Sequence, residues 1–349
     1  MRIAIDVMGG DNAPDAILAG CFDALKLLEP GDTLVLVGDE ELIREGIEER
    51  GLADASAIEI VPTSQVIDMN DKPVSALRDK PDSSIAKLAW LGGKRAGAQR
   101  CDAVISAGNT GACVAAAQMS MRRLRGVHRP GVCVTMPTFY GPVVLCDVGA
   151  NPDPRPNHLH QYALMASVFA NRVTGKDNPR VALLNVGGEE NKGSSLVLET
   201  HKLLKNDPNV NYVGYAEGRD IFEDKADVVV CEGFTGNVVI KLAEAMASGL
   251  FRTIAREIFE IDPELTLKFE PVVKSIYAKH DYHEYGGAPL LGANGVLIIC
   301  HGASEARTIV STVRQARQYL GLKVNDGIIE ALANSADASD LAPAQEELA

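Results

Sequence analysis

The sequence predicts an α/β protein: a three-layer α/β/α sandwich on a mainly parallel sheet, with a protruding helical hairpin. Short apolar segments alternate with helix-like segments along most of the 349 residues, which is the order of βαβ units. Most of the apolar segments are continuous, as expected of strands covered on both faces. One stretch, 235–285, contains no strand-like segment, and its helical periodicity predicts the hairpin.

The expected strands end at glycine, proline or polar residues, and helical periodicity fills most of the intervals between them. We expect strands at Arg2–Asp6, Thr33–Val37, Ile58–Val61, Ala103–Ser106, Val132–Met136, Val143–Val148, Val181–Val186, Asp227–Cys231 and Gly295–Cys300. We expect helices at Asp15–Leu28, Ser84–Ala98, Gly111–Leu124, Asn157–Val173, Ser194–Lys205 and Ser304–Leu320.

The hairpin is expected at about 238–283. Apolar residues recur at helical spacing from Val239 to Ile258, and Asp262-Pro263 is a turn signal. A second helix is expected from Glu264 to Lys279. The hairpin would then project from a single α/β catalytic domain formed by residues 1–333. The remaining residues, 334–349, are rich in Ala, Asp and Glu without periodicity and are expected to form a disordered tail.

The composition excludes several classes of protein. The formal net charge of −13 argues against a nucleic-acid-binding protein, which needs a basic face. Seven cysteines without a CxxC pair indicate buried thiols in a reducing compartment. The first residues form a strand rather than a basic and apolar leader, and no apolar segment approaches the length of a membrane span. We therefore expect a cytoplasmic protein.

Polar, glycine-containing turns follow several of the expected strands. The first strand ends at Asp6, and the Gly9-Gly10 pair follows almost at once. The segment 106–112 (SAGNTGA) follows another strand and begins a helix. Glycines let the backbone approach a bound group, and helix N-termini attract anions. Because ligands of open α/β sheets bind at the carboxyl ends of strands, we expect one cleft suited to phosphate.

Lys192 is the most informative cation of these turns. It lies in 185–193 (NVGGEENKG), just before a helix whose N-terminal dipole favours anions rather than cations. A bound anion between the lysine and the helix would explain this placement, and the alternative is a solvated surface lysine. For Asn109 and Thr110, the alternative to a role in the site is helix capping, because both are good helix caps.

The candidate site residues share these positions at strand ends or in the turns that follow them. The candidate catalytic residues are Lys192, Asn109, Thr110 and Asp147. The candidate substrate-binding residues are Asp6, Gly9, Gly10, Asp11, Asn12, Ser106, Gly108, Gly111, Asn151, Asn185, Gly187, Gly233, Thr235, Asn237, Gly286, Gly287 and His301.

Two further clusters have contrasting interpretations. Arg122, Arg123, Arg125 and Arg129 follow an expected helix, where they either complement its dipole or form a docking patch for an acidic partner. The trio His280, His283 and Glu284 is expected to bind no metal, because no carboxylate or cysteine set completes a site.

With these segments in view, the sequence resembles the acyl-ACP:phosphate acyltransferase (PlsX) family of bacterial phospholipid synthesis, where ACP is acyl carrier protein. The residues that carry the resemblance extend to about position 320 in the order of the family. Glu232 stands where the family usually has Asp, and Ala303 where it usually has Ser. The matching segments are IDVMGGDNAP (5–14), SAGNTGA (106–112), DVGAN (147–151), NVGGEENKG (185–193), ADVVVCEGFTGNVVIK (226–241), YGGAPLLG (285–292) and HGAS (301–304).

The resemblance implies a fold similar to phosphotransacetylases and the isocitrate/isopropylmalate dehydrogenases. It implies transfer of a long-chain acyl group from ACP to orthophosphate, without a cofactor. The acyl phosphate would pass to a membrane glycerol-3-phosphate acyltransferase. It further implies a homodimer with the active site near the subunit interface, and peripheral contact with the membrane.

This chemistry agrees with the pattern of residues. Phosphate is already a dianionic nucleophile near neutral pH, so the enzyme has to position it and stabilise an oxyanion. Positioning supplies about 7 kcal/mol or more, and each oxyanion donor about 3 kcal/mol. Backbone donors at 108–111 and at Lys192 suit both tasks. Asp6, Asp11 or Asp147 would orient donors or accept the proton of hydrogen phosphate, and the residues leave open which one does.

Three alternatives remain. A phosphotransacetylase acting on acyl-CoA shares the chemistry and much of the fold. An NAD-dependent decarboxylating dehydrogenase of the same fold class would need a cluster of metal-binding Asp residues and an arginine-rich substrate site, which the sequence lacks. A scaffold that recruits ACP to the membrane would not need so many polar glycine turns.

Overall fold

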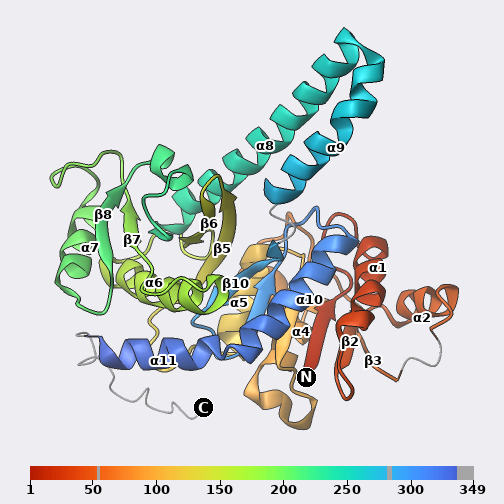
Figure 1. Cartoon of the computed structure of the whole chain (residues 1–349). Coiled ribbons are helices and arrows are strands. Elements are labelled where there is room, and N and C mark those ends of the chain that lie inside the picture. The colour runs from red at the N-terminus through yellow and green to blue at the C-terminus, as the bar shows by residue number, and fades with distance from the viewer. Residues whose placement is uncertain (53–55, 281–284, 336–349) are drawn as a thin grey trace.

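One 11-stranded sheet runs through the protein, with helices on both faces (Figure 1). The computed structural model describes residues 1–52, 56–280 and 285–335. The strand order is β3-β2-β1-β4-β11-β10-β5-β6-β9-β7-β8. The strands are β1 (Arg2–Asp6), β2 (Thr33–Gly38), β3 (Ile58–Pro62), β4 (Ala103–Ser106), β5 (Gly131–Thr138), β6 (Gly141–Cys146), β7 (Val181–Leu184), β8 (Tyr212–Ala216), β9 (Val228–Val230), β10 (Ala288–Leu291) and β11 (Val296–Ile299).

The sheet contains two parallel blocks that run in opposite directions. Strands β3, β2, β1, β4 and β11 form one block, and β6, β9, β7 and β8 form the other. Between them, β10 pairs antiparallel with β11 and β5, and β5 pairs antiparallel with β6. Ala288 pairs with the end of β11, and Leu290 pairs with Val132 of β5. The backbone of Val148, just beyond β6, also bonds to Val132. The carboxyl ends of both blocks therefore meet at the short strand β10.

Helices cover both faces of the sheet because the strands bury side chains on both faces. Ile3 and Ile5 of β1 belong to one apolar core, shared with α1, α6, α7, α10 and α11, whereas Ala4 belongs to the other, shared with α3, α4 and α5. The helices are α1 (Asp15–Ala24), α2 (Glu40–Glu49), α3 (Pro73–Asp79), α4 (Ser84–Gly92), α5 (Thr110–Ser120), α6 (Pro156–Phe169), α7 (Ser195–Asn206), α8 (Gly233–Ile261), α9 (Pro263–His280), α10 (Ala306–Gly321) and α11 (Val324–Asn334), with short helical turns η1 (Leu25–Leu27), η2 (Lys94–Gln99), η3 (Ala170–Thr174) and η4 (Gly218–Phe222).

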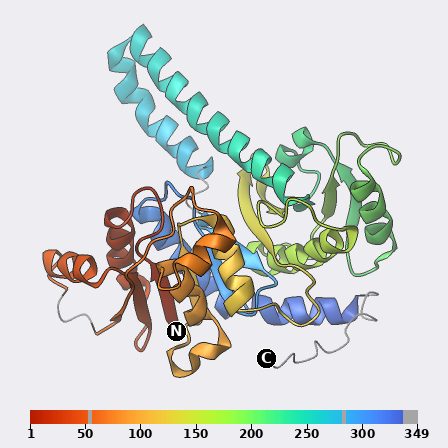
Figure 2. The same ribbon diagram turned by 180° about the vertical axis from the view of Figure 1, so that it is seen from behind.

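The helical hairpin formed by α8 and α9 stands clear of the sheet and its covering helices (Figures 1 and 2). The two helices meet at the expected Asp262-Pro263 turn. Glu232 caps α8, since its carboxylate accepts hydrogen bonds from the N–H groups of Phe234 and Thr235. No helix among the described residues is both long and apolar enough to cross a membrane.

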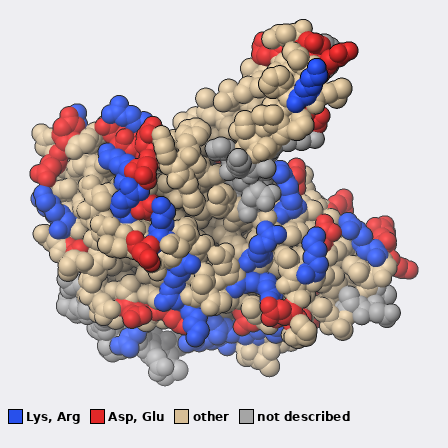
Figure 3. All heavy atoms as spheres, viewed as in Figure 1, with Lys and Arg blue, Asp and Glu red and all other residues tan. Residues whose placement is uncertain are grey.

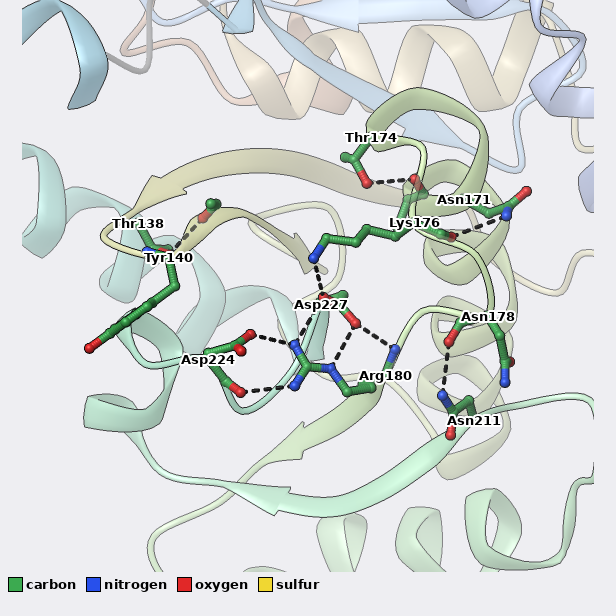
Figure 4. Close-up of polar contacts among 12 residues, drawn as sticks. Thr138, Tyr140, Asn171, Thr174, Lys176, Asn178, Arg180, Asn211, Asp224 and Asp227 are labelled. Atoms are coloured by element: carbon green, nitrogen blue, oxygen red, sulfur yellow. Dashed lines mark hydrogen bonds and ion pairs between the residues drawn. The ribbon is translucent and has the colours of Figure 1, made fainter.

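A charged cluster joins the starts of β7 and β9 in the second block (Figure 4). The guanidinium of Arg180, just before β7, donates to both Asp227 and Asp224, with Nη2 2.6 Å from Asp224 Oδ1. Lys176 Nζ lies 3.3 Å from Asp227 Oδ1. Burial opposes ionisation of Asp227, but the bonds from Arg180 outweigh it and lower the pKa of this carboxyl to about 2. The cluster anchors the loop before β7 to the start of β9.

The predicted strands and the hairpin are confirmed, and the differences lie in the elements between them. The helix expected to reach Leu124 ends at Ser120, because Arg122 has a left-handed backbone (φ 69°) and the chain turns to pair with 292–294. The sequence did not predict two strands and three helices, β8, β10, α2, α3 and α11. The part of the expected tail after Ser335 lies outside the described residues.

Candidate active site

A cavity of about 460 Å³ opens where the two blocks of the sheet meet. The carboxyl ends of β6 and β11 and the short strand β10 contribute to its wall, which is more apolar than polar. The apolar part includes Val132, Val134, Val148, Phe234, Ile240, Ala288 and Ile299. The polar part includes Thr110, Asn237, Lys241, Glu244, His301 and Thr308.

The first turns of three helices contribute to this cavity. Thr110 is the first residue of α5, Gly233 is the first of α8, and Thr308 lies in the first turn of α10. Each helix start carries a partial positive charge and backbone N–H groups without helical partners. The carboxylates of Glu232 and Glu305 already cap α8 and α10, whereas α5 is capped by the neutral side chain of Asn109. The start of α5 is therefore the helix end that favours an anion in the cavity.

Three charged or titratable side chains lie together in the wall of the cavity. Lys241 Nζ contacts His301 Nε2 and lies 3.3 Å from Glu244 Oε2. Glu244 Oε2 is also 3.7 Å from His301 Nε2. Burial, and then the positive charge of Lys241, lower the pKa of His301. The sequence predicted His301 as a site residue, but it did not predict Lys241 or Glu244.

Asp6 and Ser106 fix the turn that leads from β4 to Thr110 in the cavity wall. Ser106 donates to Asp6 Oδ2 at 2.7 Å, and Ser106 Oγ in turn accepts the N–H of Gly108. Both side chains are fully buried, and burial raises the pKa of Asp6. A Cβ at Gly9 would lie 2.5 Å from Asp6 Oδ2 and 2.7 Å from the Gly108 nitrogen, so only glycine allows these two turns to pack together.

Asp147 organises the turn after β6. Its Oδ1 accepts the N–H groups of Val132, Gly149 and Ala150, and its Oδ2 accepts the N–H of Asn151 at 2.7 Å. The carboxylate is completely buried, and burial raises its pKa despite these hydrogen bonds. Asp147 thus lies behind the cavity wall, where it holds Val148 and Gly149 in place.

The side chain of Asn109 also makes hydrogen bonds within the protein. Its Oδ1 caps α5 through the N–H of Ala112, and its Nδ2 donates to the carbonyls of Asp68, Met69 and Asp71. The side chain therefore fastens the 68–71 loop to the start of α5. Its neighbour Thr110 is exposed and lines the cavity.

The turn that contains Lys192 follows β7, which runs parallel to β9 two strands from β6. Asn185 Nδ2 donates to the carbonyls of Gly187 and Lys192 and so closes this turn. Lys192 is half exposed and pairs with Glu189 at 2.6 Å. The turn lies at the same sheet edge as the cavity, but Lys192 does not line it.

The structure divides the sequence-predicted residues into three groups. Thr110, Gly233, Asn237, Gly286, Gly287 and His301 line the cavity. Supporting turns contain Asp6, Gly9, Gly10, Asp11, Asn12, Ser106, Gly108, Asn109, Gly111, Asp147, Asn151 and Thr235, and Asn12 reaches the carbonyls of Ala303 and Ser304. Asn185, Gly187 and Lys192 form the separate turn after β7.

The arginine run lies away from the cavity. Arg122, Arg123, Arg125 and Arg129 are all exposed. The carbonyl of Arg122 accepts the N–H of Asn294, just before β11, whereas the cavity lies at the other end of β11.

Within the described ranges, no group of three or more His, Cys, Asp or Glu could hold a metal. The side chains of His280, His283 and Glu284 lie outside what the structure describes.

Comparisons with known proteins identify the family of this chain. The family model described as "Fatty acid synthesis protein" matches residues 1–326. "Phosphate acyltransferase" of Dictyoglomus turgidum is 42% identical over 97% of this chain and 100% of its own length. The chain belongs to the phosphate acyltransferase family. A relative of the same name from Heliobacterium modesticaldum is 44% identical over 91% of this chain and 93% of its own.

Solved structures of phosphotransacetylases share the fold of this phosphate acyltransferase family member. One from Streptococcus pyogenes has a TM-score of 0.59 at 16% identity, covering 95% of this chain and 93% of that one. A branched-chain phosphotransacylase from Enterococcus faecalis has a TM-score of 0.56 at 15% identity, covering 91% and 98%. The predicted three-layer, phosphotransacetylase-like fold is therefore confirmed.

Proposed function

We propose that the protein is a phosphate acyltransferase that transfers a long-chain fatty acyl group from acyl-ACP to orthophosphate. The observation that carries the proposal is the cavity at β10, where three helix starts and Lys241 face a wall that is otherwise mostly apolar. The positive end of α5 and the cation suit phosphate, and the apolar wall suits the acyl chain. The names of the relatives agree with this reaction.

The reaction needs no covalent enzyme intermediate. An oxygen of hydrogen phosphate attacks the thioester carbonyl, the new C–O bond forms, and the C–S bond breaks. The proton of hydrogen phosphate passes to the departing thiolate, so the products are acyl phosphate and the thiol of ACP. The protein has to hold phosphate against the carbonyl and stabilise the oxyanion, for which the N–H groups at the start of α5 are suitable donors.

Incubation of the purified protein with palmitoyl-ACP and phosphate tests the proposal, with the product trapped as its hydroxamate. We expect acyl phosphate to form, and its formation to depend on both substrates. The alternative is a phosphotransacetylase that uses acyl-CoA, so palmitoyl-CoA is the matched substrate. Turnover with palmitoyl-CoA that exceeds turnover with palmitoyl-ACP would favour the alternative.

The apolar stripe of α8 supports a homodimer with its active sites near the subunit interface. Phe234, Val238, Leu242, Met246, Leu250 and Ile254 recur every four residues, and each is 37–66% exposed. Phe234 also lines the cavity, so a second copy packed on the first turns of this stripe would reach the site. Sedimentation of wild type and of the double variant Leu242→Glu, Met246→Glu tests the homodimer. We expect a wild-type dimer that the variant weakens, and a wild-type monomer would contradict the proposal.

We further propose a cytoplasmic protein with peripheral membrane contact through the hairpin, delivering acyl phosphate to a membrane glycerol-3-phosphate acyltransferase. Phe259, Ile261 and Leu267 near the tip are all more than half exposed. An acyl phosphate carries a long apolar chain, so release beside a lipid surface spares that chain exposure to water.

A further inference from the structure

We propose that Lys241 and His301 together bind the phosphate that attacks the acyl group, with Glu244 competing for the same lysine. This inference rests on the proposed function and assigns its nucleophile site. The pair joins two distant parts of the chain, since Lys241 lies on α8 and His301 follows β11. Both side chains line the cavity at which α5, α8 and α10 begin.

The backbone fixes the proton on the ring of His301. The N–H of Ala303 donates to His301 Nδ1 at 3.1 Å, so Nδ1 is an acceptor and carries no proton. In the neutral ring the proton is therefore on Nε2. Burial and the nearby Lys241 lower the pKa of His301 and so favour its neutral ring. In the neutral ring Nε2 is thus a donor, like the ammonium of Lys241, so these two neighbouring groups cannot hydrogen-bond each other and both need an acceptor.

The ammonium of Lys241 and the Nε2–H of His301 are both hydrogen-bond donors at neighbouring positions. A phosphate oxygen is an acceptor that satisfies both, and charge-assisted hydrogen bonds of this kind are among the strongest in proteins. Half of the Lys241 side chain is exposed, so an entering anion can reach it without displacement of the fold.

Glu244 opposes the anion. Its carboxylate accepts a hydrogen bond from Lys241 Nζ at 3.3 Å and lies 3.7 Å from His301 Nε2, so it occupies the surroundings of the donors that phosphate would use. Asp11 adds a second negative charge that acts on His301. Removing the charge of Glu244 should therefore tighten phosphate binding, whereas removing that of Lys241 should weaken it. A purely structural role for the cluster would not give these opposite signs.

Calorimetric titration of the full chain with inorganic phosphate, in the absence of an acyl donor, tests the pair. We expect Lys241→Gln to weaken binding about 10-fold or more, and Lys241→Arg to retain most of it, because a cation remains. Glu244→Gln should bind phosphate more tightly than wild type. His301→Gln keeps an N–H donor and should bind more tightly than His301→Leu. Lys94→Gln, an exposed lysine of η2, is the matched control.

Steady-state kinetics provide the second readout. Lys241→Gln should raise the KM for phosphate and leave the KM for acyl-ACP within about twofold, since the acyl donor contacts other groups. Phosphate binding by Lys241→Gln as tight as by wild type overturns the inference, as does absence of binding to wild type. Wild type that binds phosphate through Lys241 but forms no acyl phosphate would instead contradict the proposed function.

Discussion

Lys192 is the residue for which sequence and structure suggest different environments. The glycine-rich turn predicts a phosphate or oxyanion ligand, whereas its ammonium pairs with Glu189 outside the cavity. A role in catalysis requires that this turn, at the same sheet edge, bring the lysine to the bound anion.

We predict that Lys192→Ala lowers kcat/KM about 100-fold without unfolding the protein, as loss of one oxyanion donor would. Glu189→Gln is the control, since it frees Lys192 and should keep activity. Near-normal turnover of Lys192→Ala would leave Lys241 as the cation of the site.

The buried carboxylate of Asp227 gives a prediction of pH dependence. Its pKa in the folded protein, about 2, lies below the ordinary value of 3.8. A lowered carboxyl pKa stabilises the fold above about pH 4, and this stability is lost as the pH falls towards 2. The shift corresponds to about 2 kcal/mol. Urea unfolding should find Asp227→Asn less stable than wild type by about this amount at pH 7, with the difference narrowing below pH 4. A difference that is constant from pH 7 to pH 3 would contradict the argument.

At the scale of the element, the start of α8 is the most constrained part of the site. A Cβ at Gly236 would lie 2.0 Å from the backbone oxygen of Asp147, whereas a Cβ at Gly249, on the same helix, meets nothing within 4 Å. We predict that Gly236→Ala destabilises the protein by about 1–3 kcal/mol or more and lowers turnover, because α8 must move away from the turn after β6. Gly249→Ala should be neutral or stabilising by up to about 1 kcal/mol. Thermal unfolding of the pair checks this, and equal melting temperatures would refute it.

Strand β10 and helices α2 and α11 were missed because each carries a feature that weakens its signal in the sequence. Strand β10 is four residues long and contains Pro289, which ordinarily argues against a strand. Helix α2 buries only Ile43. Helix α11 contains Gly327, where a Cβ would lie 2.6 Å from the Arg172 guanidinium, so tertiary packing overrides the helix propensity.

The same reasoning applies to the candidate site. Glycine and polar residues at strand ends could be found because their position follows from the strands. Lys241 and Glu244 could not, since a charged pair three residues apart on a helix also describes an ordinary solvated face. Only the contact between Lys241 of α8 and His301 after β11 distinguishes this pair from a solvated one. Asp147 looked like a reactive carboxylate, and only its set of backbone donors reveals a positioning role.

At the scale of the whole molecule, charge is unevenly placed on an acidic protein. The four exposed arginines of 122–129 form a local basic patch that would attract acidic ACP despite the net charge of −13. We predict that Arg122→Glu with Arg123→Glu raises the KM for acyl-ACP and weakens its dependence on salt. Arg44→Glu, on exposed α2, is the control. The patch lies at the far end of β11 from the cavity, so an unchanged KM would assign ACP docking to another surface.

The tip of the hairpin combines exposed apolar residues with acidic ones, and red atoms crowd it in Figure 3. Arg256 near the tip lies within ion-pair distance of Glu257 and Glu260. Anionic lipid should repel this rim, so we predict weak and reversible binding to vesicles, driven by apolar insertion. Co-sedimentation of the protein with neutral and with anionic vesicles measures this binding. Binding that strengthens with anionic lipid and fades with salt would contradict the prediction.

The antiparallel strands at the centre of the sheet have a consequence for synthesis of the chain. Strands β4 and β5 emerge early from the ribosome, yet the gap between them is filled by β10 and β11, and β10 begins 150 residues after β5 ends. Until residue 299 is translated, two unpaired strand edges face each other, and such edges recruit other chains. We therefore expect the nascent chain to need protection of these edges until β10 and β11 are made, and a chain that terminates before β10 to be prone to aggregation.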